Sequence, residues 1–177
     1  MNTPTTSNPH RVARALATPA AVVDAARATI GEHEDPPGSN RTRFAKIAGH
    51  PNGQQWCATW VCAILRLAGL NLPAAVTVPS TRTMYRAAAA RGWAIPVAKV
   101  RAGDVVHLSR GPLAAWKGHV AIVTGPAFKD AAGVTRIPTI EGNTNGKGSA
   151  TGGAVLAHQR PARDWNLGAW RPPYPHA

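Results

Sequence analysis

The chain has 177 residues, of which 44% are hydrophobic and 6% aromatic. This length suffices for one hydrophobic core and is short for two, so we expect one domain. The sequence contains no run of about 18 apolar residues, which excludes a membrane-spanning helix. Its first residues also lack the basic start and apolar core of a signal peptide. We therefore expect synthesis in a cytoplasm.

Basic side chains outnumber acidic ones by 20 to 8, which gives a formal net charge of +12. Residues 1–60 carry 6 basic and 4 acidic side chains, whereas residues 61–177 carry 14 and 4. Such an excess attracts a polyanion, either nucleic acid, a membrane surface or an anionic cell-wall polymer. The basic residues are scattered singly, which argues against specific reading of nucleic acid and favours a diffuse electrostatic contact.

The first half of the chain predicts helices. Residues 1–17 are polar, and we expect a flexible segment there before a domain at 18–174 and a tail at 175–177. Thr18-Pro19 is typical of a helix N-cap followed by proline in the first turn, and the helical pattern runs to about Gly31. Residues 32–53 hold several turn formers and predict a long loop. A short alanine-rich helix is expected at 81–90.

A cysteine stands at the start of the most apolar predicted helix. From Cys57 to Gly69 there is no proline, and apolar residues recur at helical spacing. Free backbone N–H groups and the positive end of the helix dipole favour thiolate over thiol at this position. Cys57 is thus a candidate nucleophile, although a small buried apolar side chain is the alternative on this segment alone. Cys62 would lie about 8 Å from Cys57 along a helix, too far for a disulfide.

The second half predicts an antiparallel sheet. Short β-forming runs are separated by glycine, proline or asparagine, and they lie at 103–108, 118–123, 136–141, 154–158 and 165–170. Helices followed by strands indicate an α+β fold, with the helices packed on the sheet. His119 opens one of these strands, where its imidazole is well fixed for use as a base. Glu141 and Asn143 end the next strand and could fix the tautomer of that imidazole.

These segments resemble a known family. Trp-Cys-Ala-Thr-Trp-Val, Gly-Asp-Val-Val, Gly-His-Val-Ala-Ile-Val and Glu-Gly-Asn follow one another at 56–61, 103–106, 118–123 and 141–143. The order is similar to that of CHAP and NlpC/P60 peptidoglycan amidases and endopeptidases, most of all the CHAP modules of bacteriophage endolysins. The resemblance covers residues 22–174. It implies a papain-like α+β fold and a monomeric enzyme, made in a host cytoplasm, that hydrolyses peptidoglycan and causes lysis.

The resemblance also implies roles for individual residues. Cys57 would be the nucleophile, His119 the general base, Glu141 the group that orients His119, and Asn143 a further polar support. The oxyanion would be bound by the backbone N–H of Cys57 and by Gln54 or Gln55. Some phage CHAP modules hold calcium in an acidic loop before the cysteine, but residues 48–56 contain no Asp or Glu. We therefore expect no metal and no cofactor.

Several residues have a plainer interpretation. We expect His50, His107 and His158 to be surface or structural histidines, because no Cys-x-x-Cys or His-Glu-x-x-His spacing indicates zinc. We expect Trp56 to wall the substrate groove, Trp60 to pack in the core, and the remaining tryptophans, Trp93, Trp116, Trp165 and Trp170, to be core or rim residues. A basic binding protein with a vestigial triad, holding wall polymer or nucleic acid, is the alternative function.

Overall fold

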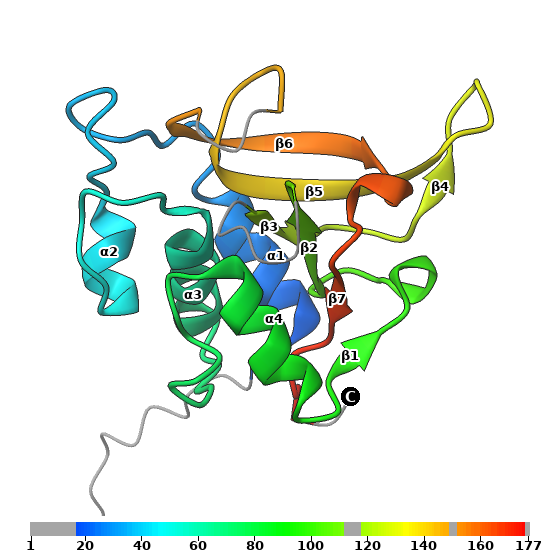
Figure 1. Cartoon of the computed structure of the whole chain (residues 1–177), viewed down its shortest axis with the longest axis horizontal. Coiled ribbons are helices and arrows are strands. Elements are labelled where there is room, and N and C mark those ends of the chain that lie inside the picture. Colours follow the sequence, from blue (N-terminus) through cyan, green and yellow to red (C-terminus); the bar gives the residue numbers. More distant parts are fainter. Residues whose placement is uncertain (1–16, 112–117, 149–151, 176–177) are drawn as a thin grey trace, which may run out of the picture.

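The structure is a computed structural model that describes residues 17–111, 118–148 and 152–175 (Figure 1). Within these residues the helices come first: α1 (Pro19–Arg27), α2 (Arg43–Ala48), α3 (Cys57–Leu67) and α4 (Thr81–Ala89). The strands are β1 (Ala94–Ile95), β2 (Val105–Ser109), β3 (Gly118–Val123), β4 (Phe128–Lys129), β5 (Thr135–Thr144), β6 (Ala154–Pro161) and β7 (Gly168–Trp170). Two short 3-10 turns, η1 (Val97–Lys99) and η2 (Ala162–Asp164), flank the sheet. None of the described helices is long and apolar enough to cross a membrane.

The strands form one antiparallel sheet in the order β1-β7-β2-β3-β5-β4, with β6 paired to β5. The four helices gather on one side of this sheet (Figure 1). The predicted α+β, papain-like architecture is thereby confirmed.

Helix α3 lies at the centre of the packing. Its residues from Cys57 to Leu65 are all buried, which is typical of a helix that is apolar on every side. It contacts α1, α2 and α4 as well as strands β3 and β5. The helix ends before Gly69, whose φ of 87° is readily adopted by glycine. Helix α1 begins as predicted, because the side chain of Thr18 accepts a hydrogen bond from the N–H of Ala21.

Strands β2, β3 and most of β5 are buried on both faces. Successive side chains of a strand point to opposite faces, and Val105 pairs with Ile122, which pairs with Ile140. These three residues join the apolar cluster around α3. The opposite face carries a second cluster that includes Val106, Ala121, Val123 and Ile137. The same face carries the buried polar side chains of His119, Thr139 and Glu141.

Several short elements were not predicted, the two 3-10 turns among them. Helix α2 lies inside the segment 32–53 that was predicted to be a loop, and β1 and β4 have only two residues each. Elements this short carry too little sequence periodicity to be recognised and depend on tertiary contacts. The last strand begins at Gly168 rather than at 165, because η2 precedes it. Trp116 and most of the segment 1–17 lie outside the described residues.

Candidate active site

Cys57 is the first residue of α3, as the sequence predicts. The preceding residue, Trp56, makes no side-chain cap hydrogen bond, so the N–H groups of the first turn stay available. Cys57 as a whole residue is 5% exposed, and its sulfur lies 3.9 Å from Oγ1 of Thr81 at the start of α4. Burial by itself raises the pKa of the Cys57 thiol, but the hydrogen bond and charge of His119, together with hydrogen bonds from Thr81 and the N–H of Ala58, outweigh burial and lower it.

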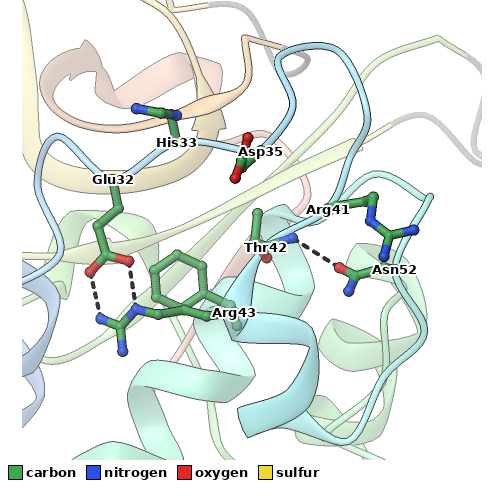
Figure 2. Close-up of a pocket in the computed structure, with 8 residues that line it drawn as sticks. Glu32, His33, Asp35, Arg41, Thr42, Arg43 and Asn52 are labelled. Atoms are coloured by element: carbon green, nitrogen blue, oxygen red, sulfur yellow. Dashed lines mark hydrogen bonds and ion pairs between the residues drawn. The ribbon is translucent and has the colours of Figure 1, made fainter.

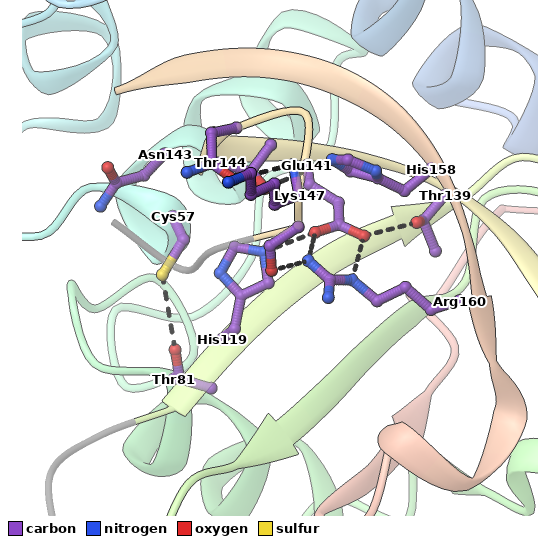
Figure 3. Close-up of polar contacts among 12 residues, drawn as sticks. Cys57, Thr81, His119, Thr139, Glu141, Asn143, Thr144, Lys147, His158 and Arg160 are labelled. Carbon is purple, nitrogen blue, oxygen red and sulfur yellow. Dashed lines mark hydrogen bonds and ion pairs between the residues drawn. The ribbon is translucent and has the colours of Figure 1, made fainter. Parts of the chain in front are cut away.

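Strand register brings His119 to Glu141. Val123 of β3 pairs with Thr139 of β5, so the alternation of side chains places His119 and Glu141 on the same sheet face. Nε2 of His119 lies 2.8 Å from Oε2 of Glu141, and both side chains are fully buried. The other edge of the imidazole is turned toward the sulfur of Cys57 (Figure 3). The sulfur, the imidazole and the carboxylate thus form a line.

The shifted pKa values of Cys57, His119 and Glu141 favour the charged form of each group. Burial lowers the pKa of His119, but contacts with Cys57 and Glu141 more than reverse this effect and raise it to about 9. Glu141 behaves in the opposite sense: burial raises its pKa, while hydrogen bonds from Arg160 and His119 bring it down to about 2. At neutral pH the cluster therefore holds a carboxylate beside an imidazolium, which in turn favours thiolate at Cys57.

Glu141 has two further partners that the sequence did not reveal. Arg160 on β6 donates to both carboxylate oxygens, from Nε to Oε1 at 2.7 Å and from Nη2 to Oε2 at 2.5 Å. Oγ1 of Thr139 donates to Oε1 at 2.8 Å. Arg160 pairs with Ile137 of β5, which places it on the face of Thr139 and Glu141. Arg160 can be recognised as a partner of Glu141 only from this long-range pairing, because no local sequence pattern around Arg160 indicates the contact.

Asn143 was expected to support His119, and its described hydrogen bonds run elsewhere. Nδ2 of Asn143 donates to Oε1 of Gln55 at 2.7 Å, and its Oδ1 accepts from the N–H of Gly153 at 3.3 Å. The register of β5 shifts between Glu141 and Thr144, and Asn143 has a φ of 59°. This irregularity breaks the simple alternation that would place residues 141 and 143 on one face.

The residues before Cys57 divide into polar and packed ones. Nε2 of Gln54 donates to the carbonyl of Pro51 at 3.4 Å, while Gln55 is half-buried and holds Asn143. Trp56 was expected to wall the groove, but it is only 2% exposed and stacks on Phe44 of α2, with ring centroids 6.0 Å apart. Because α2 was not predicted, this core partner for Trp56 was not foreseen. Trp60 is buried in the core, as predicted.

Strand β5 passes very close to α3 at this point. A Cβ atom on Gly142 would lie 2.6 Å from Cβ of Trp60. Only glycine permits this approach, which keeps the end of β5 against the first turn of α3. Glycine between Glu141 and Asn143 therefore sets the distance between the strand and the cysteine.

The remaining histidines have structural contacts. His50 bridges Oγ1 of Thr59 and the carbonyl of Thr77, at 3.0 Å each. His107 is fully buried and accepts from Nε1 of Trp170 at 2.7 Å, and burial lowers its pKa to about 3. His158 lies 3.3 Å from Oγ1 of Thr144. Among the described residues no group of three His, Cys, Asp or Glu side chains could hold a metal ion.

A separate polar pocket of about 390 Å³ lies beside the segment 32–53 (Figure 2). Within it, Arg43 donates to Glu32 at 2.6 and 2.5 Å, and the N–H of Thr42 donates to Asn52 at 2.9 Å. Its lining does not include Cys57, His119 or Glu141. Of the charged side chains that line this pocket, Arg43 and Glu32 thus pair with each other.

Comparison with known proteins agrees with this geometry. Neither a search of curated proteins nor a search of solved structures returned a match. The CHAP domain family matches residues 49–143, a span that includes Cys57, His119, Glu141 and Asn143. Arg160 lies outside the matched span. This chain belongs to the CHAP domain family, which indicates a peptidoglycan hydrolase.

Proposed function

We propose that the protein is a cysteine amidase or endopeptidase that cleaves an amide bond of peptidoglycan, with Cys57 as nucleophile. One observation carries this proposal: a thiol at a helix N-terminus, an imidazole and a buried carboxylate lie in line, with burial and charges that favour thiolate and imidazolium. That combination is how a cysteine is activated for attack on a carbonyl.

The chemistry proceeds in two halves. The Cys57 thiolate attacks the amide carbon, forming a C–S bond and placing the negative charge on the carbonyl oxygen. When this intermediate collapses, the C–N bond breaks and Nδ1 of His119 gives its proton to the leaving nitrogen. Neutral His119 then takes a proton from water, whose oxygen attacks the thioester. Breakage of the C–S bond releases the new carboxyl group and restores the thiolate.

The oxyanion needs donors near the sulfur. The backbone N–H of Cys57 supplies one, and the side-chain amide of Gln55 supplies the other. Asn143 donates to Oε1 of Gln55, which leaves Nε2 of Gln55 as the free donor edge. Asn143 thus serves the reaction by orienting Gln55, while Glu141 orients His119. This division of work agrees with the separate hydrogen bonds of the two residues.

The positive charge supports retention on the wall. Residues 61–177 carry 14 basic and 4 acidic side chains, and anionic wall polymers attract such a surface. In this proposal the enzyme acts as a monomer outside the cell membrane and causes lysis, as a phage endolysin does.

The test is digestion of purified bacterial wall, followed by mass spectrometry of the soluble fragments. Wild-type protein should release fragments with one new amine for each bond cut, and the mass pattern identifies the bond. Cys57→Ala should bind wall and release nothing. If wild-type protein binds wall but releases no fragments, the protein is the non-catalytic binding module instead.

A further inference from the structure

Arg160 contacts the site through Glu141, but the reaction steps described above give it no role. Its guanidinium grips both oxygens of Glu141 and also donates from Nη2 to the carbonyl of Gly148 at 2.8 Å. The arginine side chain is 12% exposed, and its guanidinium carbon lies 5.8 Å from the centre of the Trp165 ring. Figure 3 shows the guanidinium on the side of Glu141 that faces away from Cys57.

Hydrogen bonds to both carboxylate oxygens hold Glu141 in one orientation. Oε1 accepts from Thr139 and Arg160, and Oε2 accepts from His119 and Arg160. A fully buried carboxylate is costly unless it is paired and hydrogen-bonded. The planar fork of arginine matches a carboxylate at two points and so fixes its plane. Lysine cannot form these two parallel hydrogen bonds, and a neutral side chain cannot supply the positive charge.

Arg160 also links the carboxylate to the connection between β5 and β6. Gly148 has a φ of 71°, and a Cβ atom there would lie 2.9 Å from Nη1 of Arg160. The guanidinium is therefore packed directly against the backbone of this turn. One side chain joins the carboxylate at residue 141 to the turn that follows β5.

We propose that Arg160 is a positioning residue for the reaction: it keeps Glu141 ionised and aimed at His119, and thereby maintains the thiolate of Cys57 in mildly acidic conditions. The proposal rests on the proposed function. It differs from a purely structural ion pair in its consequence, because a structural pair would change stability without changing how Cys57 titrates.

The sign of the effect follows from burial. In the wild type, the hydrogen bond from Arg160 makes the largest single contribution to holding the pKa of Glu141 at about 2 despite burial. Without Arg160, burial raises the pKa of that carboxyl, so Glu141 takes up a proton at a higher pH. His119 then loses its anionic partner, and the thiolate–imidazolium pair gives way to neutral thiol. The acid limb of Cys57 reactivity should move to higher pH.

The experiment measures alkylation of Cys57 by iodoacetamide between pH 4 and pH 10, with peptide mass spectrometry to separate Cys57 from Cys62. For Arg160→Gln we expect the acid limb to move to higher pH by about one unit. At pH values below the midpoint of the limb, alkylation should then be about tenfold slower than in the wild type. At alkaline pH, where the thiolate is fully formed in both proteins, the two rates should coincide. Arg160→Lys keeps the positive charge but loses the two-point hydrogen bonding of the guanidinium. Its acid limb should therefore lie between those of the wild type and Arg160→Gln.

Arg110→Gln is the matched control. Arg110 also contacts the carbonyl of Gly148, at 3.4 Å, but none of the described contacts joins it to Glu141, so its loss should leave the acid limb unmoved. In a Glu141→Gln background, Arg160→Gln should cause no further shift. An acid limb of Arg160→Gln that coincides with the wild type overturns the proposal. If that variant does not fold, an unmoved limb in Arg160→Lys overturns it.

The two proposals fail separately. Alkylation needs no wall substrate, so the titration of Cys57 is measured whether or not the protein cuts peptidoglycan. The proposed function fails if wild-type protein releases no wall fragments. The role of Arg160 fails if the acid limb stays in place.

Discussion

Replacing Glu141 by glutamine tests the centre of the site, because glutamine keeps the shape and removes the charge. The pKa of His119 is raised from 6.5 to about 9, and Cys57 and Glu141 are the partners responsible. Each pKa unit corresponds to about 1.36 kcal/mol, so the whole shift is worth roughly 3 kcal/mol. If Glu141 supplies about half, its removal costs roughly 1.5 kcal/mol, or about tenfold in the ionised pair.

The assay is a pH–rate profile for the release of fragments from purified wall. His119 must be protonated to pair with the thiolate and to donate to the leaving amine, so activity is lost as pH rises through its folded-state pKa. In Glu141→Gln that pKa falls, and we expect the alkaline limb to move down by about one unit, with kcat more than tenfold lower. A variant with the wild-type rate and an unmoved alkaline limb would refute the reasoning.

A matched control separates this effect from general destabilisation. Asp104 is fully buried and accepts two hydrogen bonds from Arg171, both at 2.8 Å. It lies at the opposite end of β3 from His119, since its carbonyl accepts from the N–H of Val123. Asp104→Asn should lower the free energy of unfolding by about 3 kcal/mol. It should leave the pH limits of activity unchanged.

The remaining predictions concern other parts of the site and surface. Cys57→Ala should abolish wall digestion with little change in melting temperature, whereas Cys62→Ala should keep activity and lose about 1 kcal/mol of stability; equal inactivation of both variants would identify the wrong nucleophile. Asn143→Ala should lower kcat by about tenfold with both pH limits unmoved, and the same substitution in a Gln55→Ala background should cost nothing more. Digestion of whole wall should fall with added salt, because the Debye length is about 8 Å at physiological ionic strength, while turnover of a small soluble muropeptide should hardly change.

The sequence predicts those parts of the site that sit on strongly periodic segments. Helix α3 has an uninterrupted apolar pattern that begins at Cys57, and β3 is a continuous β-forming run that begins beside His119. Each of these residues is placed by the element that it opens. The start of an element is a local property, and local patterns are what a single sequence reveals.

Other parts depend on contacts between distant segments. Arg160 meets Glu141 only because β6 pairs with β5 in the register that sets Arg160 opposite Ile137, and periodicity within β6 does not contain that register. Asn143 turns to Gln55 because the pairing shifts after Glu141. A bulge of this kind adds one unpaired residue and has no clear signature in the sequence.

The two fully buried imidazoles of adjacent strands have opposite consequences for the folded state as a whole. His119, whose pKa is raised to about 9, stabilises the fold fully below pH 6.5, and this contribution disappears as pH rises through 9. His107, whose pKa is lowered to about 3, weakens the fold as pH falls below 6.5, because the unfolded chain takes up a proton that the folded chain refuses. Conformational stability should therefore peak between the two, near neutrality. As pH falls below 6.5, His107 therefore lowers the free energy of unfolding while Glu141, with its pKa of about 2, is still fully ionised.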